Sequence, residues 1–329
     1  MKKVLLIRLD KIGDLISTMP VDQADLLKNC EVRWVIAKGL AFVPDNAVPQ
    51  RTYIELSKED WKTSLKALVQ YLREFKPDVA VSFQAPWWVN YALWIAGTPV
   101  RAGVQSQWHS FLFLNKGLRQ RRSKAIQHEA DYNFDLLRYA MGDTSARPAT
   151  PVLKLQAPEN PELLRKFNLV PQHYVVVHPG MAGSALNWPT ENYIALIRKV
   201  AETTQVILTG TPADEPFLKD IKAAFKDHPK VLSLQNLLKA PELFTVLKNA
   251  KAVIVPSTGV AHMAASLGAK VLGLYSPIRV QHPRRWAARG ENVQIFVSNN
   301  ENPPYDSAMN EISVEDLLKA LGSISTSSN

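Results

Sequence analysis

The sequence predicts an α/β protein made of two Rossmann-like halves, each with a parallel sheet. Short apolar runs alternate with longer helical patterns along the chain, and a proline-rich stretch separates two such series. Strands that are apolar along their whole length are typical of parallel sheets covered by helices on both faces. The length of 329 residues also favours two domains over one.

The first series of strands lies in a predicted N-terminal domain, residues 1–155, and consists of VLLIRL (4–9), VRWVIA (32–37) and DVAVSF (78–83). The second lies in a C-terminal domain, residues 165–329, and consists of YVVVHP (174–179), QVILTG (205–210), AVIVPS (252–257) and KVLGLY (270–275). Proline and small residues at 146–151 and 157–161 predict the linker. A tail helix over 313–321 is expected to pack on either half, including back on the N-terminal domain, and the final SISTSSN is expected to be disordered.

Composition indicates a globular protein without disulfides, and the apolar segments predict neither a signal peptide nor a membrane span. Apolar residues make up 46% and charged residues 21%, which are values of a globular chain. The single cysteine, Cys30, leaves no intrachain disulfide and fits a reducing compartment, so we expect the cytoplasm. The apolar start is too short for a signal peptide, and the stretch Ala85 to Val100 is shorter than the roughly 20 residues of a membrane span.

Basic charge is concentrated in one segment. Lys and Arg outnumber Asp and Glu by 39 to 30, and no acidic residue lies between Asp78 and Glu129. That segment holds Arg101, Lys116, Arg119, Arg121, Arg122 and Lys124, interleaved with Trp87, Trp88, Trp94 and Trp108. Such a block suits phosphate-bearing partners, either nucleic acid or an anionic membrane surface with its amphiphiles. The alternative is a solvated basic face with tryptophans in the core.

The turn after the first strand carries a candidate base. It holds one glycine, Gly13, where a dinucleotide fingerprint needs three, and no GxxxxGK[ST] loop occurs in the chain. NAD and FAD are therefore not expected. Asp14 follows the strand's carboxyl end, where a carboxylate can accept a proton from a substrate hydroxyl. Equally, Asp14 or Asp10 could cap the following helix.

The loop after strand 174–179 is the first of two segments in the second half that predict phosphate binding. Ser184 and Asn187 lie in a loop of small residues after strand 174–179 and offer hydrogen-bond donors. Trp188 and Pro189 are interpreted as a packing corner, and Thr190 as a helix cap. Loop residues of this kind suit phosphate oxygens.

The Ser257-Thr258-Gly259 turn opens a helix of small residues, whose free amides and dipole suit a diphosphate. The alternative is a cap with a glycine for tight packing. His262 has no second histidine or carboxylate at metal spacing, so we expect a neutral or phosphate-assisting side chain and no metal site.

Acidic residues also follow strand 205–210. Asp214 or Glu215 could receive ribose hydroxyls, as acids at this place do in other nucleotide folds. They could equally be first-turn residues favoured by the helix dipole.

Together these segments resemble family 9 glycosyltransferases, the heptosyltransferases of the lipopolysaccharide inner core. The resemblance rests on five segments in order: IRLDKIGDLISTMP, HEADYNFDLLRYAMG, HPGMAGSALNWPTENY, LTGTPADE and PSTGVAHMAASLGAKVLGLYSPI. It implies a GT-B fold, with the acceptor on the N-terminal half and an ADP-sugar on the C-terminal half.

The resemblance also implies roles for single residues. Asp14 matches the catalytic base, Thr258, Gly259 and His262 match the diphosphate loop, Asp214 or Glu215 matches the ribose-binding acid, and Ser184 lies in the phosphate-binding turn. Two positions depart from the better-known members of the family. Those members carry lysine where this chain has Leu186, and aspartate where it has Ser257. These departures open the alternative of a different nucleotide sugar.

The implied reaction is a displacement with inversion, without a metal ion or a cofactor other than the ADP-sugar substrate. Lys11, Arg279, Arg284 and Arg285 are candidates for the charge that faces the diphosphate. Gly13, Arg101, Arg119, Arg121, Arg122 and Lys124 are the expected acceptor-binding residues. A cytoplasmic enzyme on the inner face of the inner membrane, with no nucleic acid partner, is expected. A catalytically inactive relative that binds a nucleotide sugar or lipid is the second alternative.

Overall fold

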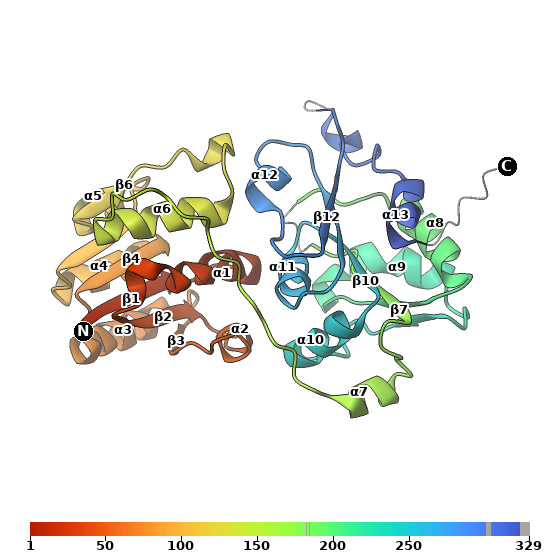
Figure 1. The fold of residues 1–329 in the computed structure, drawn as a ribbon, viewed down its shortest axis with the longest axis horizontal. Helices are drawn as coiled ribbons and strands as arrows, with labels where there is room; N and C mark the ends of the chain where they lie inside the picture. The colour runs from red at the N-terminus through yellow and green to blue at the C-terminus, as the bar shows by residue number, and fades with distance from the viewer. Residues whose placement is uncertain (182, 184, 301–303, 323–329) are drawn as a thin grey trace. The chain divides into compact units, whose positions relative to one another are not determined.

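The computed structural model describes residues 1–181, 183, 185–300 and 304–322. The chain divides into two units, Met1–Leu153 and a second that starts at Lys154 (Figure 1). Each unit holds one six-stranded parallel sheet with helices, so the predicted α/β class with two parallel sheets is confirmed. The predictions for Ser184 and for 323–329 fall outside the described residues.

The first unit has the strand order β3-β2-β1-β4-β5-β6. Its strands are β1 (Lys2–Arg8), β2 (Cys30–Ala37), β3 (Tyr53–Leu56), β4 (Val79–Gln84), β5 (Val100–Val104) and β6 (Lys116–Leu118). Its helices are α1 (Ile12–Thr18), α2 (Phe42–Asp45), α3 (Trp61–Phe75), α4 (Trp87–Ile95), α5 (Trp108–Phe113) and α6 (Glu129–Met141), with 3₁₀ turns at Met19–Gln23, Asp25–Leu27 and Arg122–Lys124.

The second unit has the order β12-β11-β10-β7-β8-β9. Its strands are β7 (Tyr174–Val177), β8 (Gln205–Leu208), β9 (Val231–Ser233), β10 (Ala252–Pro256), β11 (Val271–Tyr275) and β12 (Val293–Val297). Its helices are α7 (Pro161–Lys166), α8 (Thr190–Ala201), α9 (Glu215–Ala224), α10 (Ala240–Asn249), α11 (Gly259–Ser266), α12 (Pro283–Trp286) and α13 (Val314–Leu321), with 3₁₀ turns at Pro212–Asp214 and Tyr305–Ser307.

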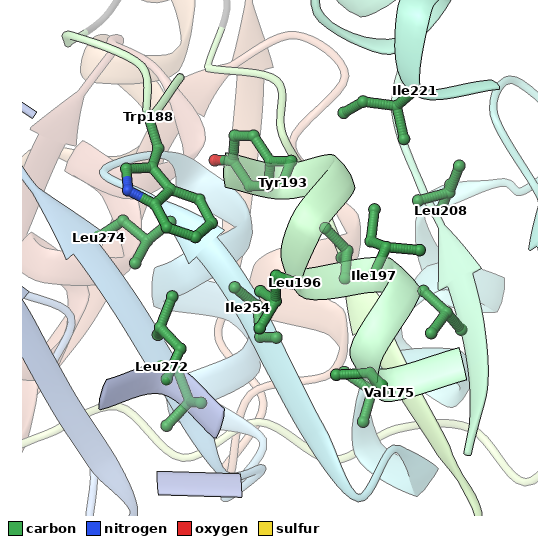
Figure 2. Packing of buried hydrophobic residues seen from close by; sticks show 14 of the residues in the cluster. Val175, Trp188, Tyr193, Leu196, Ile197, Leu208, Ile221, Ile254, Leu272 and Leu274 are labelled. Atoms are coloured by element: carbon green, nitrogen blue, oxygen red, sulfur yellow. The ribbon is translucent and has the colours of Figure 1, made fainter. Parts of the chain in front are cut away.

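The apolar runs become the central strands because they are covered on both faces. Residues Val4–Ile7 of β1 are fully buried, and β1 pairs in parallel with both β2 and β4. In the second unit, side chains of β7, β8, β10 and β11 meet those of α8 and α9 in one core (Figure 2). Each sheet therefore has a dry centre from which loops emerge at the carboxyl ends of the strands.

The packing corner predicted at Trp188 is confirmed. Its indole is buried, lies 5.0 Å from the Tyr193 ring centroid, and donates a hydrogen bond to the Ile312 carbonyl at 2.9 Å (Figure 2). The predicted cap at Thr190 is wrong, since Pro189 holds the N-cap position and Thr190 is already helical. Proline suits this place because it has no N–H to satisfy.

The tail helix α13 packs on α8 of the second unit. Leu317, Leu318 and Leu321 are buried in the same core as Trp188. The Ser313 side chain caps the helix by accepting from the Asp316 amide at 3.1 Å. Of the two halves considered, the helix thus belongs to the C-terminal one.

Each sheet reverses its strand order at one point. In the first unit this point lies between β1 and β4, and in the second between β7 and β10. In α/β sheets, ligands generally bind outside the carboxyl ends of the strands at such a reversal. Asp14 follows β1, and Thr258 follows β10, so both predicted motifs lie at these points.

Within the described part of the chain, no helix is both long and apolar enough to span a bilayer.

Candidate active site

Asp14 lies in the first turn of α1, next to a buried arginine. Lys11 occupies the N-cap position of α1, so neither Asp14 nor Asp10 caps this helix. The Asp14 carboxylate accepts a hydrogen bond from Arg8 Nη2 at 2.7 Å, and 20% of its side chain stays exposed. The carboxylate is therefore held in place by Arg8 and still accessible.

Arg8 is the centre of a cluster of carboxylates. It is 2% exposed, and its Nε lies 3.1 Å from Asp10 Oδ2 while Nη1 lies 3.7 Å from Glu129 Oε1. Glu129, at the start of α6, also pairs with Arg122. A single guanidinium thus lies close to carboxylates from the loop after β1, from α1 and from α6, because its planar fork presents N–H groups in several directions.

Burial raises the pKa of Asp14 above the ordinary range of aspartate. The Arg8 guanidinium opposes this effect by favouring the ionised form, whereas the charges of Asp10 and Glu129 raise the pKa further. A partly exposed carboxylate with a raised pKa is a stronger base than an ordinary aspartate. The partial exposure of this carboxylate suits acceptance of a proton from a substrate hydroxyl.

Two of the expected acceptor-binding arginines make structural contacts within the first unit, and their role in acceptor binding stays a prediction. Arg122 is 7% exposed and forms an ion pair with Glu129, so its charge serves the Asp14 cluster. Arg101 donates to the carbonyls of Phe113 at 2.8 Å and Thr98 at 2.7 Å, near the ends of α5 and α4.

The remaining cations of the block are more accessible. Arg119, Arg121 and Lys124 are exposed, and Gly13 is half-buried beside Asp14. These positions stay predictions for acceptor binding.

The Ser257-Thr258-Gly259 turn opens α11 as the sequence predicts. Thr258 holds the N-cap position with an extended backbone and makes no capping hydrogen bond with its side chain within the described residues. Gly259 is the first helical residue, and His262 is 7% exposed in the next turn. First-turn amides have no partner inside their own helix, so this end of α11 can donate to an anion.

The acid after β8 organises its own loop. Asp214 is 3% exposed, and its Oδ2 accepts from the Thr211 amide and hydroxyl, each at 2.8 Å. A Cβ at Gly180 would lie 2.2 Å from Asp214 Oδ1, so only glycine fits there. Asp214 thus fixes the turn that precedes α9, and a ribose contact by Asp214 stays a prediction.

Glu215 is more exposed and pairs with Lys222 at 2.6 Å. Its side-chain hydrogen bond with Lys222 lowers the pKa of Glu215, with a further contribution from Gln235. A ribose contact by Glu215 stays a prediction.

The loop before α8 is tied to the segment after β11. The Leu186 amide donates to Gln281 Oε1 at 3.2 Å, and the Leu186 side chain packs against the core. Asn187 Oδ1 accepts from the Tyr193 hydroxyl at 3.2 Å. This link joins the loop to the segment that carries three of the candidate cations, Arg279, Arg284 and Arg285.

The sequence reasoning missed three residues of these sites. Arg8 interrupts an otherwise apolar strand, and Glu129 is the first acid after the long basic segment; both were visible as irregularities. His178 directly follows β7 and lies 3.0 Å from Thr209 Oγ1 through Nδ1, and burial lowers its pKa, although Asp214 opposes this. A polar residue at the end of a buried strand was its signal.

The described ranges hold no group of three or more His, Cys, Asp or Glu side chains arranged to hold a metal ion.

Fold and sites together define a two-domain glycosyltransferase of the GT-B class. The chain belongs to glycosyltransferase family 9 (heptosyltransferase), whose sequence model matches residues 65–312. The resemblance inferred from the motifs is thereby confirmed. Asp14 lies before the matched residues, so its role depends on the geometry described above.

Individual relatives agree with this assignment. A glycosyltransferase of Haemophilus influenzae is 27% identical over 312 residues, covering 87% of this chain and 86% of that protein. E. coli ADP-heptose LPS heptosyltransferase II has a TM-score of 0.77 at 18% identity, covering 98% of both chains. E. coli heptosyltransferase WaaC with ADP has a TM-score of 0.69 at 18% identity, covering 97% of this chain and 99% of that one. The structural likenesses establish the fold.

Proposed function

We propose that this enzyme transfers a heptose from ADP-heptose to an inner-core lipopolysaccharide acceptor, with inversion at the anomeric carbon. The acceptor oxygen forms a bond to that carbon as the bond to the diphosphate breaks. The hydroxyl proton passes to Asp14, and ADP leaves with the bonding electron pair. Family membership and the names of the two E. coli enzymes support the donor.

The Asp14 carboxylate is the observation that carries this proposal. It lies at the strand-order reversal of the first sheet, is oriented by Arg8 and has a raised pKa. A general base must reach the substrate hydroxyl, and its pKa must be high enough for it to accept the proton. Asp14 combines these properties.

Charge on the departing ADP would be met by the amides that open α11 and by cationic side chains. The amides at Thr258-Gly259 and the positive end of the helix dipole favour a diphosphate. Lys11, Arg279 and Arg284 are exposed. Amides and cations of this kind support a reaction without a metal ion, so we expect a chelator to leave turnover unchanged.

A second donor class has one observation in its favour. Where better-known members carry lysine, the Leu186 side chain packs against the core. A family 9 transferase that uses another nucleotide sugar is therefore the alternative. A binding-only relative would bind nucleotide without turnover.

Calorimetry against ADP, UDP, GDP and CDP tests the donor class. We expect ADP to bind most tightly, and Gly259→Val to weaken it by about 1 to 3 kcal/mol, because a side chain there crowds the amides and leaves donors unpaired. By affinity arithmetic this is roughly 5- to 150-fold in Kd.

The matched control is Ala240→Val, at the first position of α10, which should leave ADP affinity unchanged. If folded Gly259→Val binds ADP as wild type does, the turn has only a structural role. A preference for UDP, GDP or CDP would replace ADP-heptose as the donor.

For the acceptor, we propose that Arg119, Arg121 and Lys124 face its phosphates and an anionic inner-membrane surface. Replacing all three by glutamine should raise the acceptor KM and weaken vesicle binding, since each cation contributes about 1 kcal/mol near an anionic surface. Screening should bring variant and wild type together above roughly 0.5 M salt.

Arg165, Arg198 and Lys226 form the matched control, with the same charge change on exposed residues of the second unit. ADP affinity should stay constant in both triple variants. An unchanged acceptor KM at low salt would mean that the three cations only form a solvated face.

A further inference from the structure

The outer surface of α4 and α5 is strongly apolar. Among the described residues, fifteen large hydrophobic side chains are exposed, and six of them lie on these two helices. We call this set the aromatic face; it consists of Trp87, Trp94, Ile95, Trp108, Phe111 and Leu112. Exposed apolar patches of this kind mark interaction surfaces.

Ring contacts join the two helices into one surface. The Tyr91 and Trp94 rings lie 5.5 and 5.7 Å from Phe113, measured between centroids, and Phe113 lies 6.3 Å from Trp108. Trp87 continues the row, at 6.2 Å from Tyr91. Helices α4 and α5 also pack directly on each other (Figure 1). The exposed rings thus form a continuous area.

Hydrogen bonds of the His109 side chain connect α4 with α5 beneath the exposed rings. Asn90 Nδ2 lies 2.9 Å from His109 Nδ1, and His109 Nε2 lies 2.7 Å from Gln107 Oε1. Burial lowers the pKa of His109, which favours its neutral form. Trp108 and Phe111, on either side of this anchor, are 62% and 60% exposed. Their exposure is therefore fixed by the packing of α5.

Cations border the aromatic face. Helices α4 and α5 contain no Asp, Glu, Lys or Arg. Arg101 is bonded to the Phe113 carbonyl at the end of α5, and Lys66 and Arg73 line an open groove of about 700 Å³ beside Tyr91. Glu74 is an acidic residue of this groove, and it accepts from Gln70. The rim is thus mainly positive.

We propose that the aromatic face inserts into the interfacial region of a bilayer that contains anionic phospholipid. Tryptophan is favoured at this depth because its ring is apolar and its N–H is polar. Leu112 and Phe111 would enter the acyl region, while Lys66 and Arg73 meet lipid phosphates. The inference deepens the proposed function, since a lipid-borne acceptor is reached at a membrane.

The charge pattern favours a bilayer over a protein partner. An uncharged apolar surface with cations at its rim complements a layer whose interior is apolar and whose surface is negative. The alternative occupant is a second copy of this chain. Its test is the oligomeric state in solution.

The experiment uses the full chain and vesicles of phosphatidylcholine with or without phosphatidylglycerol. Wild type should sediment with the anionic vesicles, and its tryptophan fluorescence should be quenched by brominated acyl chains. The triple variant Trp108→Ser, Phe111→Ser, Leu112→Ser should partition on the order of 100-fold less, given the apolar area removed. Trp94→Ser alone should reduce both partition and quenching if the triple variant fails to fold.

The matched control is Val48→Ser, Val170→Ser, Leu237→Ser, which removes exposed side chains elsewhere and should bind vesicles as wild type does. Equal partition of wild type and the α5 variant would overturn the inference, as would binding without quenching. A wild-type dimer that the α5 variant dissociates would assign the face to a second copy. ADP calorimetry on the same proteins separates these outcomes from a failure of the proposed function, because it needs no membrane.

Discussion

Replacing Asp14 by asparagine should lower turnover by roughly 100-fold or more, the scale expected for loss of a general base. Asparagine keeps the size of the side chain but cannot take the proton from the acceptor hydroxyl. Because the donor motifs are expected in the second unit, affinity for ADP should stay near that of wild type. Steady-state kinetics and calorimetry on the same preparation measure both quantities.

The pH dependence provides a second measurement. Burial raises the pKa of Asp14, so the base loses activity as the pH falls through a value above the ordinary aspartate range. The folded state binds this proton more tightly than the unfolded state. The Asp14 contribution therefore lowers the free energy of unfolding as the pH rises from the unfolded to the folded pKa. In Asp14→Asn both the acid limb of kcat/KM and this slope should disappear.

Asp25→Asn is the control, since it removes an exposed carboxylate of the same unit that pairs with Lys28 in an i,i+3 contact. It should leave turnover unchanged. If Asp14→Asn turned over within a few-fold of wild type, Asp14 would not be the general base. Another residue would then have to accept the proton.

The central strands were predictable because they are buried on both faces. VLLIRL became β1, and YVVVHP became β7, each between two partners in its sheet. The strands missed at the sequence level, such as β5, β6 and β9, are short and partly exposed. β6 and β9 are edge strands with one partner each, and β5 lies next to the edge, so little burial selects their residues and the apolar signal is weak.

The positions of candidate site residues were predictable only for residues that directly follow an apolar strand. Asp14 and Thr258 follow apolar strands, and the sheet order then places them at the reversals. The partners of Asp14 could not be predicted in this way. Glu129 reaches Arg8 because α6 packs on α1, where Asn133 Nδ2 donates to Thr18 Oγ1 at 2.8 Å. Helix packing of this kind depends on side-chain shape across distant parts of the chain.

Replacing Arg8 by methionine should destabilise the fold by about 3 to 5 kcal/mol at pH 8, because it removes the buried cation that pairs with Asp14 and lies between Asp10 and Glu129. Methionine fills most of the volume, so the loss is mainly electrostatic. Urea unfolding of the full chain measures it. Lys28→Met, which removes the cation of an exposed pair, should cost less than about 1 kcal/mol.

The loss in Arg8→Met should shrink as the pH falls. Arg8 favours the ionised form of Asp14, so its removal raises the pKa of that carboxyl still further. Between the unfolded value and this higher folded value, the folded state gains a proton before the unfolded state does, and the free energy of unfolding rises with acidity. Arg8→Lys should recover part of the stability but little turnover, because an ammonium lacks the fork that orients Asp14. A pH-independent loss would mean that Arg8 stabilises the unit through packing alone, and full activity of Arg8→Lys would show that Asp14 needs a nearby charge but no fixed direction.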